Sequence, residues 1–138
     1  MENRIYLRMS CEPGNVGVAR MAVTTFAATL GFTVPDIEEL KVAVSEAVSN
    51  AVLHAYPDSE GEVTVVAYPD EDGLVVLVED SGTGIPDLAK AREPGFTTSP
   101  DHMGLGLSFM ESFTDNLVLD SSPGQGTKVR MYKKRCAP

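Results

Sequence analysis

The sequence predicts an α/β (α+β) fold, a two-layer sandwich in which helices pack on one face of a mostly antiparallel sheet. Two observations support this prediction. Apolar residues recur at helical spacing in two long stretches near the start of the chain, and short apolar runs separated by turn residues dominate the rest. Because the expected strands outnumber the helices and many are joined by short turns, they should pair as hairpins.

The first strand and the first helix follow each other near the N-terminus. Within residues 4–10 two sets of side chains alternate, Ile5, Leu7 and Met9 against Arg4, Tyr6 and Arg8. This alternation is typical of a half-buried strand. From Asn15 the apolar residues follow helical spacing up to Gly31, a residue suited to ending a helix.

A second helix is expected over residues 35–56, with Pro57 ending it. On a helical projection Glu46 and Asn50 lie about 40° apart, nearly opposite the main apolar stripe. Their neighbours are alanine and leucine, so a cleft wall suits the pair better than the alternative, an exposed polar stripe. The oxygen of an asparagine suits Mg²⁺. A glutamate one turn away could polarise a hydroxyl or a water.

The remaining elements are expected in the order strand, strand, helix, strand, strand. In chain order they are strands 62–68 and 73–80, a loop-rich stretch 81–103, a short helix 106–113, and strands 116–121 and 127–134. The turn signals PDEDG and SPGQG join the first and the last pair of strands.

Length and composition favour one domain spanning residues 1–138. The chain is 43% hydrophobic, and no apolar run approaches the ~20 residues of a membrane span. The first residues have no signal-peptide pattern, so we expect a cytoplasmic protein without a membrane partner.

A formal charge of −9 argues against direct nucleic-acid binding; it suits a basic partner surface or solubility. Cys11 and Cys136 lack metal-site spacing and are expected to be free thiols.

The stretch VEDSGTGIP, residues 78–86, places Asp80 at or just past the end of an apolar strand. Gly82 and Gly84 follow at alternate positions and allow a ligand to approach the main chain. An aspartate at such a place can accept a hydrogen bond from an exocyclic amine, such as that of adenine. The alternative is an ordinary Asp-Ser-Gly turn.

The stretch MGLGLSFME, residues 103–111, places Gly104 and Gly106 at the start of a helix. Free N–H groups and the helix dipole favour phosphate at such a position. The alternative is a flexible helix start. Neither glycine stretch completes G-x-G-x-x-G or a Walker A loop, which argues against a Rossmann or P-loop protein.

The order of the motifs is more specific than any one of them: E-x-x-x-N on a helix, D-x-G-x-G after a strand, G-x-G opening a helix, and Gly126-Thr127 before the last strand. This set resembles the ATPase family shared by gyrase, heat-shock chaperones, sensor histidine kinases and mismatch-repair proteins. Within it, the chain is most similar to the anti-sigma-factor serine/threonine kinases of Gram-positive bacteria. SEAVSNAVLHAY, DSGTGIPD, GFTTSP and MGLGLSFMESFTD are close to the sporulation anti-sigma-F factors.

The resemblance implies a Bergerat-type ATP-binding fold and a role for each motif residue. Asn50 would ligate Mg²⁺, and Glu46 would be the catalytic base. The implied contacts with ATP are Asp80, Gly82, Gly84 and Thr127 around the adenine, and Gly104, Leu105, Gly106 and Leu107 at the phosphates. Residues 87–103 would form the lid over ATP.

The resemblance also implies partners. The expected substrate is a serine on an anti-anti-sigma protein, and the expected second partner is a sigma factor held inactive by a kinase homodimer. On the first helix, Val18 and Met21 point away from the apolar stripe and Arg20 lies on its flank. We take this surface as a candidate partner contact, against the alternative of ordinary exposed apolar residues. The strand at 4–10 is the candidate dimer surface.

The chain departs from the family pattern in the lid, where relatives often carry Arg or Lys just before the G-x-G. Here no Lys or Arg occurs between Arg92 and Lys128, and only His102 is near. A lid cation would stabilise charge on the transferring phosphoryl group, so Lys90 or Arg92 would have to fold back to replace it.

Two other functions stay open. One is a detached histidine-kinase catalytic domain, although the chain has no second helical domain with a phospho-accepting histidine and His54 lies within the expected Asn50 helix. The other is a non-catalytic sequestering module that binds ATP only for shape, against which Glu46 argues.

Overall fold

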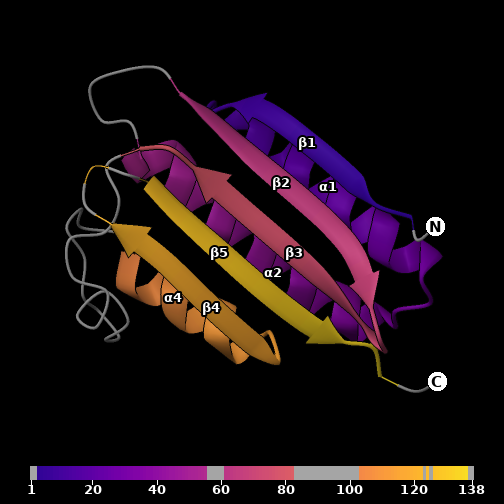
Figure 1. The fold of residues 1–138 in the computed structure, drawn as a ribbon. Coiled ribbons are helices and arrows are strands. Elements are labelled where there is room, and N and C mark those ends of the chain that lie inside the picture. Colours follow the sequence, from indigo (N-terminus) through magenta and orange to yellow (C-terminus); the bar gives the residue numbers. More distant parts are fainter. Residues whose placement is uncertain (1–2, 56–60, 83–102, 123, 125, 137–138) are drawn as a thin grey trace.

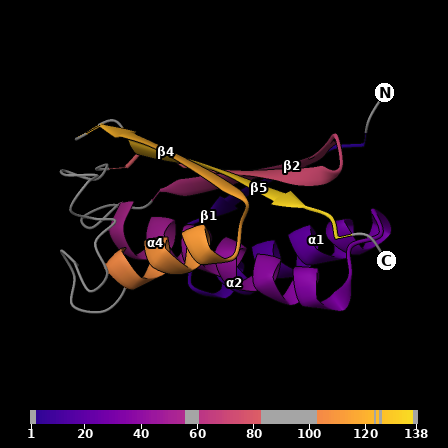
Figure 2. The same cartoon turned by 90° about the horizontal axis from the view of Figure 1, so that it is seen from below.

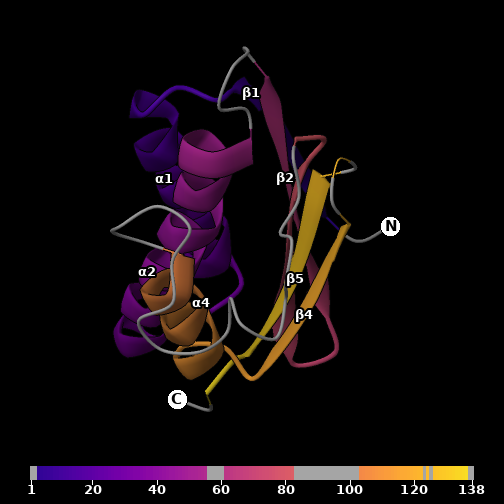
Figure 3. The ribbon, with the colours of Figure 1, turned by 90° about the vertical axis from the view of Figure 1, so that its left-hand side faces the viewer.

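The computed structural model describes residues 3–55, 61–82, 103–122, 124 and 126–136. Within them the chain forms one sheet with helices on a single face, so that the side-on view has two layers (Figures 1 and 3). The predicted two-layer sandwich is therefore confirmed.

The sheet described by these residues has five strands in the order β1-β2-β3-β5-β4, and every neighbouring pair is antiparallel. The strands are β1 (Ile5–Ser10), β2 (Glu62–Asp70), β3 (Gly73–Asp80), β4 (Asn116–Ser122) and β5 (Gly126–Lys134). The helices are α1 (Gly14–Thr29), α2 (Val34–Asn50), the π-helical turn η1 (Ala51–Ala55) and α4 (Met103–Ser112). Each strand overlaps its predicted segment, and β1 and β4 are the two edges.

The helix α1 ends as the sequence predicts. Leu30 is its C-cap, and Gly31 follows with φ +86°, a left-handed conformation that glycine adopts without steric cost.

The helix α2 begins at a side-chain cap and ends earlier than predicted. Thr33 is the N-cap, and its hydroxyl accepts the backbone N–H of Asp36 at 3.3 Å. We expected regular helix to about residue 56, but α-helical bonding stops at Asn50 and η1 follows. The apolar spacing continues through the turn, so the pattern alone does not reveal this change. Single π-turns often occur at functional sites.

The helix α4 begins at Met103, three residues before the predicted start at 106. The apolar spacing reaches back from Leu107 to Met103, but the two glycines between them lower the helix propensity of this turn. Leu107 and Met110 are fully buried and hold α4 against the core.

The core lies between the sheet and the helix layer, with α2 in the middle of that layer between α1 and α4. Alternate side chains of the inner strands face it: Val63, Val65 and Ala67 from β2, Leu74, Val76 and Val78 from β3, and Val129 and Met131 from β5. Because α2 is covered by two helices as well as by the sheet, its buried face is wide. Ala43 and Ala47 are buried together with Leu40, Val44 and Val48.

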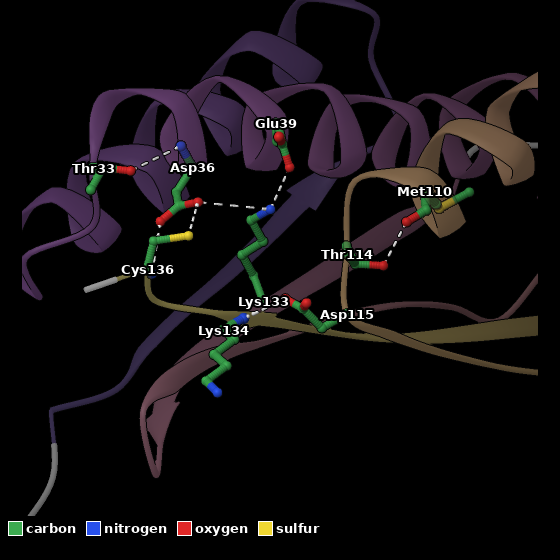
Figure 4. A network of polar contacts seen from close by, with 9 residues as sticks. All are labelled: Thr33, Asp36, Glu39, Met110, Thr114, Asp115, Lys133, Lys134 and Cys136. Carbon is green, nitrogen blue, oxygen red and sulfur yellow. Dashed lines mark hydrogen bonds and ion pairs between the residues drawn. The ribbon is translucent and has the colours of Figure 1, made fainter. Parts of the chain in front are cut away.

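A buried polar network ties the end of β5 to the first turn of α2 (Figure 4). The Lys133 ammonium lies 2.5 Å from Glu39 Oε2 and 4.0 Å from Asp36 Oδ1. Asp36 is 4% exposed and accepts hydrogen bonds from the Cys136 N–H at 3.1 Å and from its Sγ at 3.3 Å. Burial raises the pKa of the Asp36 carboxyl, but its hydrogen bonds to Cys136 and Thr33 and the charge of Lys133 together outweigh burial and lower the net pKa.

Cys11 and Cys136 are both free thiols, as predicted. Among the helices that the structure describes, none is long and apolar enough to cross a membrane.

Candidate functional site

Most of the predicted site residues that the structure describes lie at one end of the molecule. The strands β3 and β4 end there, β5 and α4 begin there, and α2 passes into η1 at the same end (Figures 1 and 2). The turn η1 contacts both β3 and β5, which brings the helix layer and the sheet together at this point. Motifs that are 30 to 80 residues apart in the sequence are thus collected by the antiparallel topology.

Glu46 and Asn50 are one turn apart near the C-terminal end of α2, and both are half-buried. Buried Ala43 and Ala47 flank them, which excludes a plain solvent-facing polar stripe. The Oδ1 atom of Asn50 is shielded from solvent and has no hydrogen-bond partner among the described residues. Leaving a buried acceptor unpaired costs about 1–3 kcal/mol, so this oxygen is suited to a donor or a cation that the chain itself does not supply.

Asp80 is the last residue of β3, where the sequence analysis placed it. Its Oδ1 accepts the Gly82 N–H at 2.9 Å, and its carboxylate also accepts the N–H of Thr127. Burial raises the pKa of the Asp80 carboxyl, these two N–H groups lower it, and the Glu79 carboxylate raises it; the net pKa is above the ordinary value. The result is an oriented, partly desolvated acceptor.

Asp80 belongs to a row of three polar residues that crosses adjacent strands. Thr127 of β5 pairs directly with Asp80 of β3 and, on its other side, with Ser121 of β4. The hydroxyls of Ser121 and Thr127 lie 2.9 Å apart. The sequence predicted Asp80 and Thr127 as site residues but not Ser121, because only the register between β4 and β5 places Ser121 beside Thr127.

The row opens onto a pocket of about 180 Å³ at the end of the sheet. Its described lining comes from three strands: Glu79, Asp80, Asp120, Ser121, Gly126, Thr127 and Lys128. Gly126 has φ +91°, and a Cβ there would lie 2.7 Å from Ser81 Cα and overlap the Asp80 carbonyl oxygen. Only glycine lets the start of β5 approach β3 this closely, so Gly126 fixes the position of Thr127 relative to Asp80.

The first turn of α4 contains Gly104, Leu105 and Gly106, and the next residue, Leu107, is buried in the core. A helix start has N–H groups without intrahelical partners, and these attract anions. The helix packs against α2, which carries Glu46 and Asn50. Gly84, His102 and the predicted lid residues before Met103 lie outside the described residues, as do Lys90 and Arg92.

A divalent cation fits this site if most of its ligands are phosphates and waters and few are protein oxygens. In the part of the chain that the structure describes, no three His, Cys, Asp or Glu side chains form a metal-binding group. Mg²⁺ is commonly held by few protein oxygens together with phosphates and waters. The unpaired Oδ1 of Asn50 fits that manner of binding.

Arg20 lies on a different surface, on the helix layer. Its side chain is half-buried and donates to the Ser45 hydroxyl of α2 at 3.4 Å. Val18 and Met21 beside it are 52% and 60% exposed, which confirms that they point away from the core.

Comparisons with known proteins agree with this geometry. Residues 9–133 match a family model described as "Histidine kinase-like ATPase domain". The chain is 41% identical to the anti-sigma F factor of Clostridium acetobutylicum, over 97% of this chain and 95% of that protein. It is 39% identical to the anti-sigma F factor of Bacillus subtilis, over 96% and 93% of the two chains.

Among solved structures, the chain is similar to the crystal structure of the RsbU and RsbW domains of Rv1364c from Mycobacterium tuberculosis. The TM-score is 0.72 at 20% identity, and the match covers 99% of this chain and 33% of that one. At this identity the likeness supports the fold alone.

Proposed function

The chain belongs to the histidine kinase-like ATPase family, and on this premise we propose that it is an anti-sigma factor with protein serine/threonine kinase activity. It would hold a sigma factor inactive and use Mg-ATP to phosphorylate a serine of an anti-anti-sigma protein. The observation that carries the proposal is the unpaired Asn50 oxygen at the same end of the fold as the oriented Asp80 carboxylate. The Asn50 oxygen is suited to the metal ion bound by the phosphates of a nucleotide, and the Asp80 carboxylate is suited to the base.

In the proposed complex Asp80 accepts a hydrogen bond from the adenine amine, and Gly82 keeps the adjoining main chain open to the base. Asn50 Oδ1 holds Mg²⁺, which neutralises phosphate charge when bound. The first turn of α4, from Gly104 to Leu107, supplies N–H groups to the phosphate oxygens.

Glu46 then acts on the partner's serine. Its carboxylate accepts the hydroxyl proton as the serine oxygen attacks the γ-phosphorus. The bond between the γ-phosphorus and the oxygen that bridges the β- and γ-phosphates breaks, and ADP leaves with that oxygen. The position of Glu46 one helical turn before Asn50 supports this role, because base and metal ligand then share one rigid element. Lys90 or Arg92 of the lid would fold back to supply the cation that stabilises the transferring phosphoryl group.

Arg20, Val18 and Met21 are the proposed contact for the sigma factor or the anti-anti-sigma protein. Exposed apolar side chains around one cation suit a protein partner. For the proposed homodimer, the candidate surface is β1, an edge strand whose Tyr6 is 68% exposed.

The experiment that tests the function combines the protein with Mg-ATP and candidate anti-anti-sigma proteins, and intact mass reports the gain of one phosphate on the acceptor. Wild type should transfer, and an acceptor with its serine replaced by alanine should gain nothing. Arg20→Glu should weaken capture of at least one partner while ATP affinity stays unchanged. Binding of ATP and sigma factor without any transfer would instead identify a non-catalytic sequestering module.

A further inference from the structure

The Ser121 hydroxyl occupies the outer end of the Ser121-Thr127-Asp80 row, on the edge strand β4 (Figure 1). It donates to the Gly126 carbonyl oxygen at 3.0 Å and lies 2.9 Å from Thr127 Oγ1. A hydroxyl carries one proton. Because a carbonyl oxygen only accepts, the contact with Gly126 is satisfied when Ser121 donates to it, and both contacts are satisfied together only when Thr127 donates to Ser121.

This position of the proton determines which hydrogen-bonding groups Thr127 presents to the pocket. With its own proton directed at Ser121, the Thr127 oxygen presents only lone pairs to the pocket that it lines. Asp80 beside it is also an acceptor, and its two backbone donors hold it in place. The polar wall formed by these two side chains therefore accepts hydrogen bonds and donates none.

We propose that Ser121 is a specificity-determining positioning residue, which holds the Thr127 hydroxyl as an acceptor so that the pocket selects a purine with an amine, not an oxygen, at carbon 6. The inference rests on the proposed function, because it assumes that the pocket holds the base of ATP. An amine supplies protons to two acceptors, or to one of them and a bridging water. A carbonyl oxygen at the same position would face lone pairs and have no donor.

Removal of the Ser121 hydroxyl should change the specificity more than the fold. Without its acceptor, the Thr127 hydroxyl is free to rotate and to donate into the pocket, where a 6-oxo purine can use the new donor. Inosine triphosphate (ITP) is the matched probe, because it differs from ATP at this position while keeping the ribose and the phosphates.

The test is calorimetric titration of the full chain with Mg-ATP and with Mg-ITP at one fixed pH. Wild type should prefer ATP, and Ser121→Ala should reduce that preference by about fivefold, the equivalent of one net hydrogen bond. Ser121→Thr should restore it, because threonine keeps the hydroxyl. Ser10→Ala, on the opposite edge strand, is the control and should leave the preference unchanged.

A double-mutant cycle distinguishes the effect of Ser121 on the orientation of the Thr127 hydroxyl from a loss of packing. In a Thr127→Val background, which has no hydroxyl to orient, Ser121→Ala should cause no further change in preference. Equal weakening of ATP and ITP binding by Ser121→Ala, or an unchanged preference, would overturn the inference, while ATP binding by the wild type would still support the proposed function. Ser121→Cys, which keeps the side-chain size, repeats the test if the alanine variant melts early. A wild type that binds neither nucleotide would overturn the proposed function and the inference with it.

Discussion

The Lys133 ammonium of β5 lies 2.5 Å from the Glu39 carboxylate of α2, although the two residues are separated by 94 positions in the sequence. The contact is deep: the Lys133 side chain is 9% exposed, and a second carboxylate, that of Asp36, lies 4.0 Å from the same nitrogen (Figure 4). One cation therefore compensates two carboxylates where the last strand meets the central helix.

Replacement of this cation should destabilise the fold without affecting ligand binding. Lys133→Met keeps the length of the stem but leaves Asp36 and Glu39 uncompensated, and breaking a buried pair costs about 3–5 kcal/mol, with less expected here because Glu39 is partly exposed. Urea unfolding measures the loss. Arg8→Met is the matched control, since its pair with Glu62 is exposed and should contribute no measurable stability. Equal effects of the two substitutions would contradict the assignment.

Acid should weaken the same network through Asp36. The folded-state pKa of this carboxyl is lower than its unfolded value of about 3.9, so its contribution is present above that value and is lost as pH falls through the folded pKa. Asp36→Asn does not titrate. The stability difference between wild type and this variant should therefore shrink as the pH falls below about 4. A difference that stays constant over the acid range would show that Asp36 is not ionised in the folded protein.

The network shows what the sequence could reveal and what it could not. The alternation of the last strand puts Lys133 on the same face as Val129 and Met131, so its burial was detectable. The partners of Lys133, Asp36 and Glu39, could not be predicted, because they depend on how α2 packs on the sheet. Asp80 could be placed at a strand end because an uninterrupted apolar run precedes it.

Ser121 and η1 mark the limit of the sequence-based prediction. Ser121 acquires its neighbour through strand register, and a shift of one residue would turn it to the other face. The turn η1 keeps the apolar spacing of the preceding helix, so the change in hydrogen bonding at Asn50 leaves no trace in that spacing.

The close approach of β5 to β3 predicts unequal effects at two glycines of one turn. Gly124 and Gly126 both have positive φ, +77° and +91°, so alanine at either position is strained by about 1–2 kcal/mol. A Cβ at Gly124 would meet nothing within 4 Å, whereas a Cβ at Gly126 would meet the Asp80 and Ser81 backbone. Gly126→Ala should therefore lower the melting temperature further than Gly124→Ala. It should also weaken ATP binding, which Gly124→Ala should leave intact. Equal behaviour of the two variants in both assays would argue against the role of Gly126.

Asp80 should affect the free and the nucleotide-bound protein in opposite directions. ATP at a hundredfold excess over Kd stabilises the native state by about 2.7 kcal/mol, which appears as a rise in melting temperature. Asp80→Asn should remove most of that rise, because the amide presents a donor where adenine also presents one. Without nucleotide the variant should melt slightly higher than wild type at neutral pH, since a partly desolvated charge is gone. An undiminished nucleotide shift would exclude Asp80 from the base contact.

Glu46 and Asn50 should fail in different ways if the first acts on the partner's hydroxyl and the second on the metal. Asn50→Ala removes an oxygen that has no partner in the described protein, so it should weaken Mg-dependent nucleotide binding and transfer together at little cost in stability.

Glu46→Gln keeps size and most hydrogen bonds but cannot take the serine proton. Loss of a positioned base typically costs about 10²- to 10⁴-fold in rate. This variant should therefore bind ATP and hold its sigma factor nearly as wild type does, yet barely phosphorylate the anti-anti-sigma serine. A structural role predicts the reverse, a lower melting temperature with transfer retained per folded molecule. Single-turnover transfer within about tenfold of wild type would be too fast for an enzyme without its general base, and the catalytic role of Glu46 would then be wrong.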